Sequence, residues 1–149
     1  MNNTARFGPP KKLAVARILL ADSDLASRLT LNSLLSRAGY AVDTAATASE
    51  AIGKLDTNEY QLVLADLKSE SEDAGDALLS YARLKEFSPA TALISSDLTA
   101  THVWEYVADS ASTIVRMSQD NICYLLARIA ELIGNRADRR FRQSLLRAS

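Results

Sequence analysis

The chain has 149 residues, of which 48% are hydrophobic and 23% charged, and its net charge at neutral pH is −1. This composition is typical of one globular domain with a hydrophobic core. The net charge gives no reason to expect that the chain as a whole binds nucleic acid or a membrane surface. The single cysteine excludes an internal disulfide, and no apolar run is long enough to span a bilayer. The single cysteine makes a reducing cytoplasm the simplest location, and the N-terminus lacks an apolar signal segment.

The first part of the chain predicts an arm, a strand and a helix. Residues 1–13 are polar and carry a Gly-Pro-Pro sequence, which predicts a flexible arm. A short apolar run predicts a buried strand over 16–21, followed by Asp22, Ser23 and Asp24. Either Ser23 or Asp24 can cap the next helix, which Gly39 is expected to end.

The same alternation of strand and helix continues to the end of the domain. Further strands are predicted at 40–45, 61–66, 91–95 and 113–116. Further helices are predicted from the capping box Thr47–Glu50, over 76–87, over 100–109, and from Ser118 through Ile133.

Five successive strand–helix units predict an α/β fold with a parallel sheet between two layers of helices. We expect a flavodoxin-like (βα)5 three-layer sandwich with the strand order 2-1-3-4-5, in which the first and third strands are neighbours at the switch point. Asp22 and Asp24 would then converge with Asp66, which ends the apolar run Leu62–Ala65. Such a carboxylate cluster can hold a hard cation, and Mg²⁺ is the usual choice.

The composition changes after Gly134, so we expect one domain over 14–134. Residues 135–149 contain five arginines against one acid, Asp138, and Phe141, Leu145 and Leu146 are spaced for a helix face. This segment is predicted to be a basic amphipathic extension of the last helix, or the start of a linker helix.

Taken in order, these segments resemble the receiver domain of two-component response regulators over about 16–133. Ile18–Asp24 is similar to the family's first strand and acidic turn, and Leu62–Leu67 to the strand that carries the phospho-acceptor aspartate. Gly75–Leu79 is similar to the start of the third helix, and Ala38–Tyr40 is also typical of the family.

The resemblance implies that Asp66 accepts a phosphoryl group from a phosphohistidine of a partner histidine kinase or phosphotransfer protein. It implies a Mg²⁺ ion held by Asp22, Asp24, Asp66 and the backbone carbonyl of Lys68. A hydroxyl residue at the end of the fourth strand, matched by Ser95, would turn toward the phosphoryl group.

The pocket departs from the family pattern at several positions. Ser23 stands where the family has a second acid, which weakens the expected Mg²⁺ site. Arg116, followed by Met117, stands where the family has a Lys-Pro pair, and an arginine fork does not replace a compact ammonium group conservatively. Ile114 occupies the place of the switch aromatic, and the side chain of Lys68 could supply part of the missing positive charge.

The resemblance therefore implies an atypical receiver. It would signal through the face formed by 100–109, 113–116 and the last helix, to a downstream protein or a covalently linked output domain. The predicted helix 100–109 and the last helix could also pair with those of a second copy to form a homodimer. As an enzyme it would at most catalyse its own phosphorylation and dephosphorylation.

Other functions stay open beside this one. The main alternative is a phosphorylation-independent pseudo-receiver that acts as a protein-binding or dimerisation module. A flavodoxin-like small-molecule binder or enzyme is disfavoured because no Gly-rich phosphate loop follows the first strand and no nucleophile–base pair is visible. A nucleic-acid role is not expected, since it rests on the arginine-rich tail alone.

Overall fold

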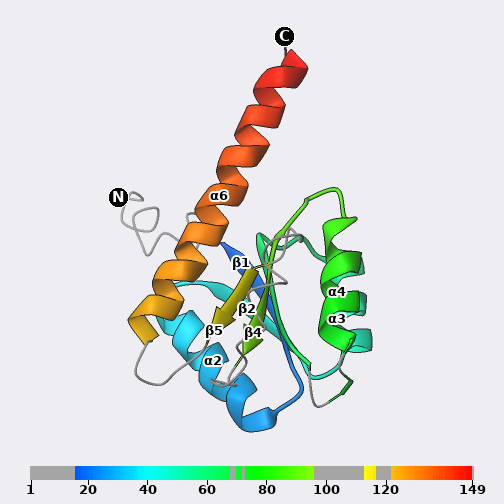
Figure 1. The fold of residues 1–149 in the computed structure, drawn as a ribbon, viewed down its shortest axis with the longest axis vertical. Helices are drawn as coiled ribbons and strands as arrows, with labels where there is room; N and C mark the ends of the chain where they lie inside the picture. Colours follow the sequence, from blue (N-terminus) through cyan, green and yellow to red (C-terminus); the bar gives the residue numbers. More distant parts are fainter. Residues whose placement is uncertain (1–15, 68–69, 72, 96–112, 117–121, 149) are drawn as a thin grey trace, which may run out of the picture.

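The computed structural model describes residues 16–67, 70–71, 73–95, 113–116 and 122–148 (Figure 1). The elements are β1 (Arg17–Asp22), α2 (Leu25–Arg37), β2 (Ala41–Ala45), α3 (Ala48–Thr57), β3 (Leu62–Asp66), α4 (Ala74–Arg83), β4 (Ala90–Ser95), β5 (Thr113–Arg116) and α6 (Ile122–Ala148). The predicted arm 1–13, the predicted helix 100–109 and the capping residue Ser118 lie outside the described residues.

The sheet is parallel, and its strands have the order β2-β1-β3-β4-β5. The predicted α/β class with a parallel sheet is confirmed, as is the neighbourhood of β1 and β3. Because the predicted helix 100–109 is not described, the count of five strand–helix units stays a prediction. No helix in the described part of the chain is long and apolar enough to cross a membrane.

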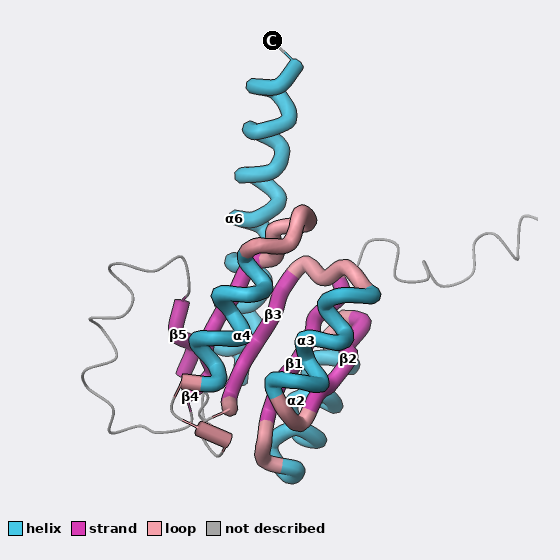
Figure 2. The backbone as a smooth tube through the Cα atoms, turned by 90° about the vertical axis from the view of Figure 1, so that its right-hand side faces the viewer, coloured by secondary structure: helices cyan, strands magenta, loops and turns pink. Residues whose placement is uncertain are grey.

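Helices cover both faces of the sheet. Figure 2 shows α3 and α4 in front of the strands and α2 behind them, on the side of α6. Two apolar clusters lie between the sheet and the helices. One packs against α3 and α4, and the other packs against α2 and α6. Along β1, Leu19 and Ala21 belong to the first cluster, whereas Ile18 and Leu20 belong to the second. This alternation follows from the two-residue period of a strand that is buried on both faces.

Side-chain caps fix where two helices begin. Asp24 Oδ2 accepts a hydrogen bond of 2.8 Å from the Ser27 amide at the start of α2. Thr47 Oγ1 accepts one of 3.1 Å from the Glu50 amide, and the Glu50 carboxylate accepts one of 2.7 Å from the Ala46 amide. The predicted capping box is thus present, with its returning bond one residue earlier than in the standard motif.

The prediction for α4 was wrong at both ends. The helix runs from Ala74 to Arg83 instead of over 76–87, so Gly75 lies in its first turn. Leu84 is the C-cap of the helix and is 84% exposed. The helix ends early because the next residues form tight turns toward Pro89, which disfavours helical backbone at Ser88. Ser88 instead has a positive φ of 41°.

The last helix is continuous through Gly134, so the predicted helical extension is part of α6. Figure 1 shows its C-terminal half leaving the body of the domain. Near its start, Cys123 is exposed. The domain boundary predicted at residue 134 therefore does not coincide with a helix end and stays a prediction.

Candidate functional site

The carboxyl ends of β1 and β3 bring two acids together. Asp22 and Asp66 are register partners across these parallel strands. Asp22 is only 1% exposed, whereas Asp66 is half-buried. In an open α/β sheet this edge is where ligands reach the strands, so Asp66 lies at a position that a reaction partner can approach.

The buried carboxylate of Asp22 is held by the turn that comes after it. Its Oδ1 accepts a hydrogen bond of 2.9 Å from the Asp24 amide, and its Oδ2 accepts one of 2.6 Å from the Ser27 hydroxyl. Arg28 Nη1 donates to the backbone oxygen of Asp22 at 2.7 Å. Burial of an unpaired charge would be costly, so these donors explain how an acid is accommodated there.

Ser23 and Asp24 have structural contacts of their own. The Ser23 amide and hydroxyl both donate to the backbone oxygen of Asp66, at 3.1 and 3.4 Å. Ser23 therefore ties the turn after β1 to the end of β3. Asp24 is exposed and caps α2, which is one of the two roles that the sequence left open for it.

Two of the three predicted carboxylate ligands, Asp22 and Asp66, are register partners, and the third, Asp24, caps α2. Within the described ranges, no group of three or more His, Cys, Asp and Glu side chains could hold a metal ion. Asp24 is used as a cap, and both oxygens of Asp22 accept hydrogen bonds from the chain. Asp22 and Asp66 still form a pair of carboxylates, and Mg²⁺ is commonly held by one or two carboxylates with water completing its coordination. The carbonyl of Lys68, the fourth predicted ligand, is outside the described residues.

The remaining predicted residues can be located by their backbones. Ser95 and Arg116 end β4 and β5 and are register partners, so they lie at the same edge of the sheet as Asp22 and Asp66. Ile114 of β5 pairs with Leu93 of β4 and therefore lies two strands away from β3. The topology thus brings the predicted acceptor, hydroxyl and basic positions to one edge.

Sequence reasoning missed three residues that shape this edge. Ser27 and Arg28 bind Asp22, and Glu70 accepts a hydrogen bond of 3.0 Å from the Ala48 amide, which ties the loop after β3 to the start of α3. The signal for the first two was present, because a helix capped by Asp24 brings its first-turn side chains close to the strand end. The contact of Glu70 had no local signal.

No family model and no curated protein matches the chain. Solved structures do match it, and one is a response regulator receiver domain protein from Methanospirillum hungatei. It is 24% identical with a TM-score of 0.70, over 84% of this chain and 98% of that one. A response regulator protein from Thermotoga maritima, in complex with Mg²⁺-BeF, is 26% identical with a TM-score of 0.66, over 78% and 97%.

A third solved structure with a similar fold is that of adenylate cyclase from Rhodopirellula baltica. It is 20% identical with a TM-score of 0.75, over 91% of this chain and 99% of that chain. Each of these three solved chains is thus matched over nearly its whole length.

Proposed function

We propose that this chain, which has the fold of the response regulator receiver domains, accepts a phosphoryl group on Asp66 in two-component signal transduction. The observation that carries the proposal is the register of Asp22 with Asp66 at the carboxyl ends of adjacent parallel strands, with Asp66 half-buried. An acid at this edge is close enough to solvent for a partner to approach, and it is held in place by a buried strand. The donor is a histidine kinase or a phosphotransfer protein.

The reaction moves one phosphoryl group between two side chains. An oxygen of the Asp66 carboxylate attacks the phosphorus of a phosphohistidine, an O–P bond forms, the N–P bond breaks, and the imidazole leaves. Positioning and neutralisation of charge limit the rate of such transfers. Arg116 and Lys68 are the cationic residues that we assign to this task, and Ser95 with Ile114 forms the responding pair. We assign no other enzymatic activity to the chain.

We expect this transfer to be slow. The described part of the chain contains no group of three or more acidic, histidine or cysteine side chains that could hold a metal ion, and Ser23 stands in place of an acid. The same observation supports a second candidate function, a pseudo-receiver that signals without phosphorylation. In that case Asp22 is a structural acid whose hydrogen bonds hold the turn between β1 and α2.

The output in either case is a protein surface. We propose a (βα)5 domain in the cytoplasm whose face at 100–109, β5 and α6 contacts a downstream protein or a linked output domain. The projecting half of α6 carries exposed apolar residues, among them Phe141 and Leu145, which could also pair two copies of the chain.

A titration with Mg²⁺ distinguishes the phosphorylated receiver from the pseudo-receiver. The purified protein is titrated with and without beryllofluoride, and Trp104 fluorescence is measured. Beryllofluoride mimics a phosphoryl group on an aspartate, and labelling by acetyl phosphate gives a second readout. We expect a saturable change when Mg²⁺ and beryllofluoride are both present, and this change should be lost in Asp66→Ala. Asp73→Ala, which removes an exposed acid from the loop after β3, is the matched control and should respond like the wild type. A folded protein with neither response nor label would contradict phosphorylation and support the pseudo-receiver.

A further inference from the structure

A second concave site lies at the opposite edge of the sheet from Asp66. The cleft encloses about 380 Å³ between α6 and the turn that leads from α4 into β4, and it includes the first residues of β4. Four arginines line it, and no aspartate or glutamate does. The net charge of the whole chain is −1, so this positive charge is a local feature of the cleft.

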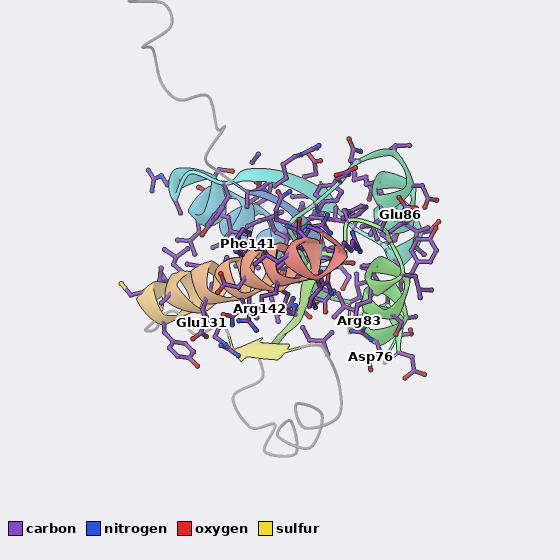
Figure 3. The ribbon with its side chains drawn as sticks, turned by 90° about the horizontal axis from the view of Figure 1, so that it is seen from above. Asp76, Arg83, Glu86, Glu131, Phe141 and Arg142 are labelled. Atoms are coloured by element: carbon purple, nitrogen blue, oxygen red, sulfur yellow. The ribbon has the colours of Figure 1, made fainter. Side chains whose placement is uncertain are left out.

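One face of α6 supplies most of the positive charge. Arg136, Arg139, Arg140 and Gln143 line the cleft, and their spacing of three, four and seven residues puts them on one side of a helix. Asp138 lies two positions from Arg136 and therefore on a different side. Arg83 completes the set from the last turn of α4, and Figure 3 shows it on the side of α4 that faces α6.

The arginines differ in how far the fold already uses them. Arg136 is 9% exposed, and it donates to the backbone oxygens of Ser88 at 3.0 Å and Phe87 at 2.5 Å. It thus forms the floor of the cleft and holds the turn before β4. Arg140 makes one bond of 3.3 Å to the Glu86 backbone oxygen. In the described part of the chain, Arg139 makes no hydrogen bond or ion pair.

Neighbouring arginines act on the charge of Arg136. Burial lowers the pKa of Arg136, and the charges of Arg140 and Arg139 lower it further, while Glu59 acts weakly in the opposite direction. Arginines stay protonated at neutral pH, so the guanidinium groups repel one another in a partly enclosed space. An anion bound between them would relieve this repulsion.

We propose that this cleft binds a small anion that carries two or more phosphoryl groups, contacted by Arg83, Arg139 and Arg140 above the floor formed by Arg136. Planar guanidinium groups match pairs of phosphoryl oxygens, and several of them together favour a ligand with several charges. The volume lies within the range of small-molecule pockets, so it can also accommodate an organic group attached to the phosphates. The ligand would bridge α6 to the turn before β4.

Isothermal titration calorimetry tests this with inorganic tripolyphosphate and a nucleoside triphosphate as probes, in about 0.1 M salt. The variant R139Q/R140Q should bind at least about tenfold more weakly, because it loses two charge-assisted contacts. The matched control is R142Q/R147Q, which removes the same charge from exposed positions of α6 that do not line the cleft. It should lose less than about twofold. Circular dichroism of both variants verifies that α6 is intact.

Three results would overturn the proposal. The first is the absence of saturable binding in the wild type. The second is an equal loss in both variants, which would mean that the probes follow the general charge of the helix. The third is equal binding of citrate, or tighter binding of a single-stranded oligonucleotide, since either would exclude selectivity for small phosphoryl anions. A tighter complex with the nucleotide than with tripolyphosphate would support an organic phosphate as the ligand.

Discussion

At the scale of single residues, the site depends on the serine that comes directly after Asp22. Ser23 donates hydrogen bonds to the end of β3 through both its amide and its hydroxyl. An ionised aspartate side chain at this position could not donate the second bond, because its carboxylate only accepts. The chain therefore stabilises its acidic pocket with hydrogen bonds where a cation would otherwise balance two adjacent acids. Asp22 is kept buried by the same means, through the Ser27 hydroxyl and the Asp24 amide.

The substitution Ser23→Asp should reverse this balance. Without Mg²⁺ we expect the variant to lose about 1 kcal/mol of stability, because a hydrogen bond to Asp66 is lost and a like charge is added beside Asp22. With about 10 mM Mg²⁺ it should regain this stability and more, since a ligand that binds only the folded state stabilises it. Thermal unfolding with and without Mg²⁺ measures both effects, and the wild type should respond little.

The control for this variant is Ser27→Ala, which weakens the hold on Asp22 without adding charge. It should lose stability in the same way but gain no response to Mg²⁺. A wild-type response to Mg²⁺ as large as that of Ser23→Asp would contradict the argument, because it would mean that the pocket already holds the ion.

At the scale of elements, one buried tyrosine links three strands. Tyr60, just before β3, is fully buried and donates a hydrogen bond of 2.6 Å to Asp43 Oδ2 on β2. The same oxygen pairs with Arg17 of β1 at 2.7 Å, and the Arg17 guanidinium lies 5.0 Å from the ring centre of Tyr60. Burial raises the pKa of Tyr60 well above its usual value, and the hydrogen bond to Asp43 raises it further.

This arrangement predicts a loss of stability at high pH. Below about pH 10 the hydroxyl is protonated in the folded and the unfolded chain, and its contribution is fully present. Above that pH only the unfolded chain releases the proton, so the free energy of unfolding falls as the pH rises. Tyr60→Phe should cost about 1–3 kcal/mol at pH 8, since the bond to a carboxylate is lost, and its stability should fall less steeply above pH 10.

Urea unfolding at pH 8 and at about pH 10.5 measures both effects. Burial also raises the pKa of Tyr40, so the free energy of unfolding of Tyr60→Phe should still fall at high pH, but by less than that of the wild type. The matched control is Tyr124→Phe, at an exposed position of α6, which should keep the wild-type pH dependence. Identical slopes for Tyr60→Phe and the wild type would exclude Tyr60 as the cause.

The elements also show how far the sequence could predict the site. The strands that end at Asp22 and Asp66 were predictable, because short apolar runs followed by acids have few other interpretations in a parallel sheet. The end of α4 was not, since Leu84 continues a helical pattern and the turns toward Pro89 depend on Arg136, which is 48 residues away from Ser88. The cleft of arginines was missed for the same reason: the helix face is visible in the sequence, but its partner on α4 is not.

At the scale of the whole molecule, α6 both closes one layer and leaves the domain. Its 27 residues span about 40 Å, and only its first half packs on the sheet. Beyond Arg136 it carries Phe141, Leu145 and Leu146, which are 65, 55 and 75% exposed. The arginine side that lines the cleft and these apolar residues share the same few turns.

The exposed apolar residues of α6 and the arginines of the cleft predict opposite responses to salt. Burial of each apolar side chain between two copies is worth up to about 1.5–3 kcal/mol, but the arginines of facing helices repel. We therefore expect weak self-association that strengthens as salt rises from about 0.05 to 0.5 M, whereas anion binding in the cleft weakens. Sedimentation velocity over a range of concentrations measures it. F141Q/L145Q should be monomeric, while Leu29→Gln, at an exposed leucine of α2, should associate like the wild type. Association that weakens with salt would mean that charge pairing, and not this apolar face, brings the two copies together.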